Sequence, residues 1–188
     1  MAEVVFLKSV DKHKFKEELI KKVKEAVKYF PELENETIYV GILDSKDDAD
    51  GRADSVNRII KFRIDVKPTY VTIFHELMHV VIRIMHEKGE KVPLTSEKFC
   101  SISAMARMPP ELIDEEVIPY IGTPKVPKHL IPEICRRALE YRKHHRNYIE
   151  KCEEWLGCSI KQWGKGSVDI SVWITAETKE RDRRGNKV

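Results

Sequence analysis

The alternation of apolar and polar residues predicts a short sheet in the first third of the chain. Residues 37–43 (T-I-Y-V-G-I-L) alternate and are rich in β-branched residues, as is typical of a strand. Residues 57–66 predict a second strand, and residues 4–7 predict a shorter one. The acidic segment 44–54 contains Gly51 and predicts a loop, because aspartate and glycine favour turns.

Apolar residues at helical spacing predict that most of the remaining chain is helical. Thr69 and Ser96 each precede such a segment and are suitable N-caps. The predicted helices span residues 12–30, 70–88, 96–108, 111–118 and 131–156. Residues 167–175 alternate again and predict a strand, and the whole pattern predicts an α+β fold.

The helix predicted over residues 70–88 carries the sequence H-E-L-M-H at positions 75–79. Residues four apart on a helix share one face, so both imidazoles can reach one metal ion. Glu76 is then placed to accept a proton from a metal-bound water. His75 and His79 could instead be core side chains with ordinary hydrogen bonds. The pair with an intervening glutamate, in an otherwise apolar helix, favours the metal.

A catalytic metal of this kind needs a third protein ligand. A third histidine six residues after His79 is absent, because Met85 stands there. His86 and Glu87 lie about 10 Å further along the helix axis, too far to share the ion. Glu97 is the favoured candidate, because it opens the next predicted helix after a short loop. Weaker alternatives are Glu90, Glu111 and Asp114.

The H-E-x-x-H sequence followed by a glutamate on a second helix resembles the gluzincin metallopeptidases, and most closely the small archaeal minigluzincins. The resemblance covers roughly residues 36–108. It implies that His75, His79 and Glu97 bind Zn²⁺, and that Glu76 acts as general base and then as general acid. It also implies a small zincin-like α+β domain that hydrolyses peptide bonds in a peptide or protein substrate, as an endopeptidase rather than an exopeptidase.

The resemblance leaves the residue that stabilises the oxyanion unassigned. Conceivable candidates are His86, Tyr120, His129, Tyr141 and His144. The rival interpretations are a regulatory or binding protein with a zincin fold and little general proteolysis, and a protein in which zinc only stabilises the fold. An exposed strand edge near the site would bind an extended peptide, but the strands could also merely cover the helix.

Composition shifts divide the chain into four parts. We expect a zincin-like catalytic domain over 1–108, a proline-rich linker over 109–127, a C-terminal extension over 128–176 that packs on the domain, and a charged, disordered tail over 177–188. The extension exceeds what a minimal gluzincin needs. It could complete the core, form a homodimer surface, or cover the cleft and keep the enzyme latent, as a zymogen.

Net charge and the pattern of charges limit the classes of partner that the sequence supports. A net charge of +3 is too small to imply a polyanionic partner, and acids interspersed among the basic residues of 131–156 favour a solvated helix face over nucleic acid. No apolar run is long enough to span a membrane, so we expect a cytoplasmic protein. The excess of lysine and glutamate over amides is typical of thermophiles. A second metal site at Cys152 and Cys158 with His144 or His145, and a calcium loop at Asp44–Gly51, are weaker hypotheses.

Overall fold

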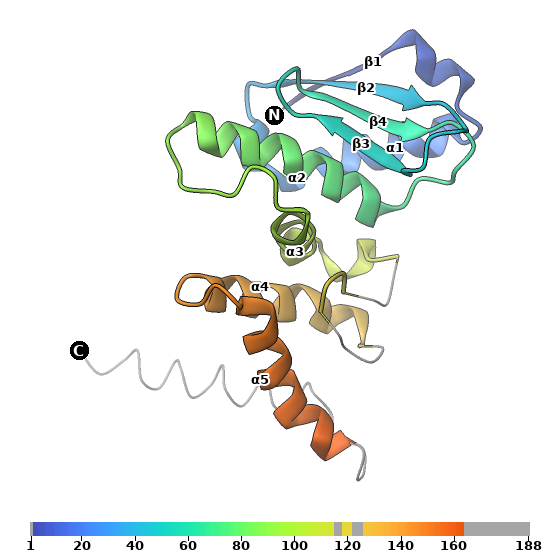
Figure 1. The fold of residues 1–188 in the computed structure, drawn as a ribbon. Coiled ribbons are helices and arrows are strands. Elements are labelled where there is room, and N and C mark those ends of the chain that lie inside the picture. Colours follow the sequence, from blue (N-terminus) through green and yellow to red (C-terminus); the bar gives the residue numbers. More distant parts are fainter. Residues whose placement is uncertain (1, 115–117, 122–125, 164–188) are drawn as a thin grey trace.

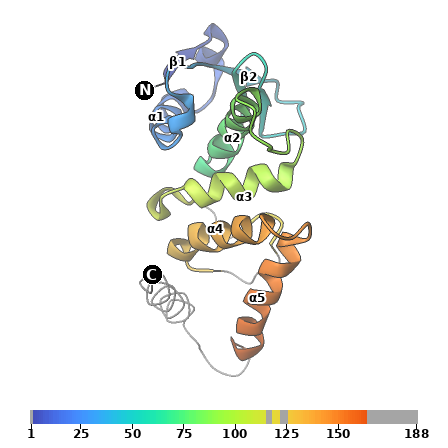
Figure 2. The same cartoon turned by 90° about the vertical axis from the view of Figure 1, so that its left-hand side faces the viewer.

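The protein is described from a computed structural model, which covers residues 2–114, 118–121 and 126–163; side chains are described up to residue 156. It is an α+β structure in which a four-stranded mixed sheet is followed by helices stacked progressively further from it (Figures 1 and 2). Figure 2 shows α2, α3 and α4 as successive layers, with α5 beyond them.

The sheet has the strand order β1-β2-β4-β3. Its strands are β1 Glu3–Phe6, β2 Thr37–Leu43, β3 Gly51–Asp54 and β4 Ile59–Arg63. β1, β2 and β4 run parallel, whereas β3 pairs antiparallel with β4 and forms one edge (Figure 1). The predicted strand over 37–43 is confirmed, and those over 4–7 and 57–66 are confirmed with shifted ends.

The prediction that residues 44–54 form only a loop is wrong, because the last four of them form β3. G-R-A-D has little intrinsic preference for a strand. Pairing with β4, which aligns Gly51 with Phe62 and Ala53 with Ile60, supplies the stabilisation that local propensity lacks. This strand lies against helix α2 and becomes one wall of the candidate site described below.

In the described part of the chain, five α-helices follow or flank the sheet. They are α1 Lys16–Ala26, α2 Tyr70–Glu87, α3 Glu97–Arg107, α4 Ile131–Arg142 and α5 Tyr148–Trp163. The predictions for α2 and α3 are confirmed. The segment predicted as one helix over 12–30 contains α1, with short 3₁₀ turns Lys8–Lys12 and Val27–Tyr29 on either side.

Two helix predictions are wrong in the C-terminal half. The segment 131–156 is not one helix, since α4 ends at Arg142 and α5 begins at Tyr148. The break itself, residues 143–147, reads K-H-H-R-N, and Arg142 and Arg146 are four apart across it, a spacing at which like charges disfavour a continuous helix. Instead of a helix over 111–118, the described residues form a 3₁₀ turn, Pro110–Leu112. The strand predicted over 167–175 and the tail over 177–188 lie outside the described residues.

One face of the sheet supplies the core. Side chains of alternating strand residues, including Ile38, Val40, Ile60 and Phe62, are buried against the helices. α2 runs through this core and is buried along most of its length, which fixes its position relative to the sheet. No helix among the described residues has the length and apolar character that crossing a bilayer requires.

Side-chain caps fix the starts of α2 and α3, and an ion pair fixes the end of α3. Thr69 caps α2 by accepting from the Thr72 amide at 3.0 Å, and Ser96 caps α3 by accepting from the Phe99 amide at 3.2 Å. At the other end of α3, Arg107 donates two hydrogen bonds, of 2.7 and 2.6 Å, to the carboxylate of Glu32. Thr69 and Ser96 therefore fix where the two helices start, and the Arg107–Glu32 pair ties the end of α3 to the segment before β2.

Candidate metal centre

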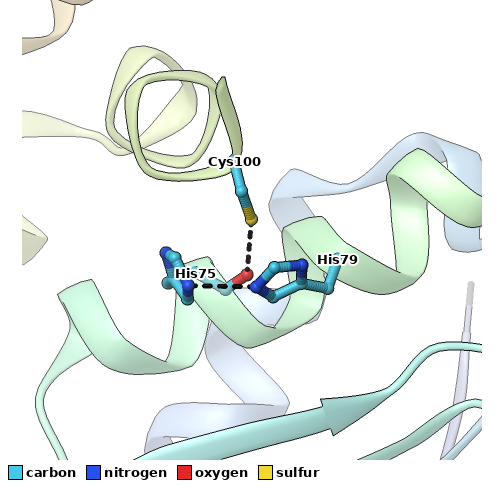
Figure 3. A group of neighbouring side chains, drawn as sticks. All are labelled: His75, His79 and Cys100. Atoms are coloured by element: carbon cyan, nitrogen blue, oxygen red, sulfur yellow. Dashed lines mark hydrogen bonds between the residues drawn. The ribbon is translucent and has the colours of Figure 1, made fainter. Parts of the chain in front are cut away.

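His75 and His79 lie one turn apart on α2 and turn their imidazoles toward each other (Figure 3). Their Nε2 atoms are 3.1 Å apart. Glu97, the first residue of α3, places its Oε2 3.0 Å from Nε2 of His75 and 3.3 Å from Nε2 of His79. Three potential ligand atoms from two helices therefore form a nearly equilateral triangle.

The size of this triangle fits a tetrahedral ion. Ligands held about 2.0–2.1 Å from tetrahedral zinc lie about 3.3 Å from one another. Two imidazole nitrogens and one carboxylate oxygen are also a donor set that catalytic zinc uses, with a fourth position left for water or substrate. His75, His79 and Glu97 therefore fit a zinc ion.

Ser101 contacts Nδ1, the ring nitrogen of His75 that is not part of the triangle. Its Oγ lies 3.0 Å from Nδ1 of His75, one turn after Glu97 on α3. A hydroxyl that accepts the Nδ1–H proton leaves Nε2 with a free lone pair directed at the triangle. Burial and the charge of His79 lower the pKa of His75, which favours the neutral imidazole that metal binding requires.

Cys100 offers a competing ligand. The reactive atoms of His75, His79 and Cys100 lie within 4.8 Å of one another and could together hold a metal ion (Figure 3). The Cys100 thiol, however, donates to the carbonyl of His75 at 3.2 Å, and burial raises its pKa far above the usual range. A bound cation would itself favour the thiolate, so Cys100 stays an alternative ligand; the triangle completed by Glu97 is the one whose sides match the ligand separations of tetrahedral zinc.

Glu76 lies beside the triangle and is 5% exposed. Burial and the negative charge of Glu97 raise its pKa to about 8, against the weaker opposing effect of Arg52. A bound cation would favour the carboxylate and lower this pKa again. Glu76 is therefore a carboxyl group poised to hold or release a proton near neutral pH.

The backbone of β3 packs directly on Glu76. A side chain at Gly51 would place its Cβ 2.8 Å from Oε1 of Glu76 and 2.9 Å from Cγ2 of Thr72, closer than real contacts allow. Only glycine fits between the edge strand and α2 at this point. Sequence reasoning missed Gly51, because it placed the residue in a loop; the G-R-A-D alternation was the only available signal.

A hollow of about 580 Å³ opens beside the three candidate ligands. Its walls are β3, with the residues just before and after it, and the loop that joins α2 to α3, represented by Leu94 and Thr95. A second, smaller hollow of about 230 Å³ lies on the other side of His75, lined by α2 and α3 side chains such as Thr72 and Met105. The site is thus open to a ligand on both sides of His75.

The alternative third ligands lie elsewhere. Asp114 accepts hydrogen bonds from the Tyr70 and Val71 amides, at 2.7 and 3.3 Å, and so caps the N-terminus of α2. Glu90 and Glu111 do not line either hollow at the triangle. The same holds for the five candidates for oxyanion stabilisation, His86, Tyr120, His129, Tyr141 and His144.

The proposed second metal site and calcium loop gain no support among the described residues. Cys152 is fully buried, with its thiol toward the carbonyl of Ile134, whereas His144 and His145 are exposed. The side chain of Cys158 lies outside the described residues. In the acidic loop, Asp47 pairs with Arg52 at 2.9 Å instead of converging with its neighbours on one point.

Comparison with known proteins gave no relatives: no family model matches the chain, and no curated protein or solved structure is significantly similar to it.

Proposed function

We propose that this protein is a zinc-dependent peptidase with a small zincin-like fold. The proposal rests on one observation: His75, His79 and Glu97 bring three ligand atoms to within 3.0–3.3 Å of one another, beside the buried carboxyl of Glu76. A structural zinc site is closed by four protein ligands, whereas the proposed set has three and opens onto a hollow; the nearby Cys100 thiol donates to the carbonyl of His75 instead.

Zinc bound there would lower the pKa of a coordinated water to about 7 and polarise a substrate carbonyl. Glu76 accepts the proton of the attacking water and passes it to the leaving amine. Its burial between α2 and β3 holds the carboxyl in place, and bound zinc would lower its pKa from the raised value of the metal-free site, so that the carboxylate is available as a base. Ser101 holds His75 in the orientation and tautomer that binding requires.

The edge strand β3 suits an extended peptide substrate. The Arg63 amide donates to the Asp50 carbonyl at 3.0 Å, just before β3. In an antiparallel pair, residues that hydrogen-bond to the partner strand alternate with residues that do not. Because Asp50 bonds to Arg63, the N–H and C=O groups of Gly51 and Ala53 point away from β4. Both residues line the hollow beside Glu76. A peptide added to this edge therefore runs past the proposed zinc.

The test pairs two substitutions. Glu76→Gln is expected to retain one zinc per chain and to lose cleavage by about 10²- to 10⁴-fold, the usual contribution of a general base. Glu97→Ala is expected to weaken zinc binding itself. Zinc is measured by elemental analysis, and cleavage with casein and a peptide library, with and without chelator. Full activity of Glu76→Gln would refute the mechanism.

Zinc binding without cleavage in the wild type would favour a regulatory or structural zinc protein, unless the chain is latent. Removal of residues after Trp163 tests latency. Truncation near Gly122 would be unsuitable, because it removes α4, whose Ile131, Ile134 and Ala138 are buried in the common core that includes α3. Zinc without cleavage by the shortened chain as well would reject the peptidase.

A further inference from the structure

The turn between α4 and α5 concentrates basic side chains around a hollow far along the chain from the zinc site. Residues 142–146 read R-K-H-H-R, and together with Tyr148 they line an open hollow of about 430 Å³. The side chains from Lys143 to Arg146 are exposed, and Arg142 is half-buried. The proposed peptidase chemistry makes no use of this surface.

The charges of this turn are poorly neutralised. Lys143 pairs with Glu140 at 2.8 Å, but neither Arg142 nor Arg146 forms an ion pair with a carboxylate within the described part of the chain. Most other arginines there do have such partners, namely Arg52, Arg58, Arg63, Arg83, Arg107 and Arg136. Within the described residues, guanidinium groups that have no carboxylate partner are therefore a feature of this turn.

The guanidinium of Arg142 is held in place. It lies over the ring of Phe99 on α3, 4.3 Å from the ring centroid. Stacking on a ring occupies the face of the guanidinium and leaves the N–H donors at its edge available. Less side-chain entropy is then lost when an anion binds these donors.

Tyr148 also lines the hollow, but its hydroxyl is enclosed. The residue is 7% exposed, and its hydroxyl is buried with no hydrogen-bond partner among the described residues. Burial raises the pKa of Tyr148, and the charge of Arg142 opposes this shift, so the hydroxyl is within electrostatic reach of the guanidinium. Less than 1 Å² of the hydroxyl oxygen is exposed, so a ligand in the hollow does not reach it, and the guanidinium groups are the available donors.

We propose that the α4–α5 turn binds a phosphate group, with Arg142 and Arg146 as its donors. Phosphate carries several acceptor oxygens and matches the guanidinium fork, as the donor set requires. A single hollow at one turn, in place of a basic stripe along a helix, favours a small phosphorylated molecule over the backbone of a nucleic acid. The proposal is independent of the zinc site.

The first experiment titrates the full-length protein with inorganic phosphate at constant ionic strength, balanced with chloride. Binding is followed by shifts of the backbone amide signals of residues 143–148. The double variant Arg142→Gln/Arg146→Gln is expected to weaken binding at least tenfold. Arg136→Gln is the matched control, because Arg136 is an exposed α4 arginine already paired with Glu133 at 2.7 Å.

Tyr148→Phe is a second control, in the lining of the hollow itself. It removes the enclosed hydroxyl and keeps the ring, so thermal stability is expected to stay equal or rise, and phosphate affinity to stay unchanged. The proposal is overturned if the double variant binds phosphate as well as Arg136→Gln does, or if chloride alone reproduces the shifts.

A second arm identifies the source of the phosphate. Fluorescence anisotropy of a labelled 20-nucleotide single strand is measured against salt concentration, beside competition by inorganic phosphate and a nucleoside monophosphate. If the natural ligand is a small phosphorylated molecule, as we expect, inorganic phosphate or the nucleoside monophosphate displaces the labelled strand at a concentration close to the dissociation constant of that small molecule. An oligonucleotide bound more than tenfold tighter than either, with a steep salt dependence, would overturn the assignment to a small molecule.

Discussion

Gly51→Ala isolates the contact between the edge strand and the proposed general base. The added Cβ would lie 2.8 Å from Oε1 and 2.9 Å from Cγ of Glu76. Ordinary carbon contacts begin near about 3.5 Å, so the strand or the glutamate must move by about 0.6 Å. Overpacking of this kind costs about 1–3 kcal/mol, and a misplacement of about 1 Å can reduce turnover about 100-fold.

Gly41→Ala is the matched control, since this glycine is in the same sheet and its Cβ would meet neighbours at 3.4 Å or more. Urea unfolding of zinc-loaded protein compares stability, and peptide cleavage compares activity. Gly51→Ala should lose stability and activity while retaining zinc, because the atoms nearest to the new methyl group belong to Glu76 and Thr72 and not to a proposed zinc-binding residue. If Gly51→Ala were as stable and active as Gly41→Ala, the close packing of β3 on Glu76 would be refuted.

Three further outcomes are expected. Ser101→Ala should weaken zinc binding by about 10- to 100-fold, measured by competition with a chromophoric chelator, because Nδ1 of His75 loses its partner; unchanged affinity would exclude this supporting role. Zinc at a free concentration 100 times its dissociation constant should raise the free energy of unfolding by about 2.7 kcal/mol over that of the zinc-free protein. Equal melting curves with and without zinc would show that the folded state binds no zinc. Burial lowers the pKa of His13 below 6.5, so stability should fall as pH drops through 6.5, where the unfolded chain takes up a proton that the folded chain does not. His13→Asn, whose amide oxygen can still accept from the Phe15 amide, should flatten that decline; identical pH profiles would contradict it.

The helices of the candidate site could be predicted from the sequence because their signals are local. Thr69 and Ser96 mark the two helix starts, and the apolar pattern of α2 leaves its polar residues conspicuous. Helix geometry then excludes ligands further along α2, and the structure brings Glu97 to the two histidines. What remains a prediction is the metal itself and its chemistry.

The parts that sequence reasoning missed depend on contacts between distant segments. β3 exists because β4 pairs with it, and Gly51 matters because Glu76 approaches it from another element. The break between α4 and α5 is different, because it falls at a local basic run, Arg142 to Arg146, within an otherwise helical pattern. Local periodicity does not contain the first two relations, since each requires knowing which segment lies opposite.

The anchoring of α3 at both ends has a consequence for how this protein could vary during evolution. Because Ser96 and the Arg107–Glu32 pair fix the helix, the position of Glu97 does not depend on the composition of the loop before it. Residues 88–91 of that loop are exposed. Insertions there would cost little, as loop entropy grows slowly with length. The number of residues between His79 and Glu97 could therefore change without moving Glu97. A search that requires a fixed spacing between these two residues would overlook proteins with a longer or shorter loop.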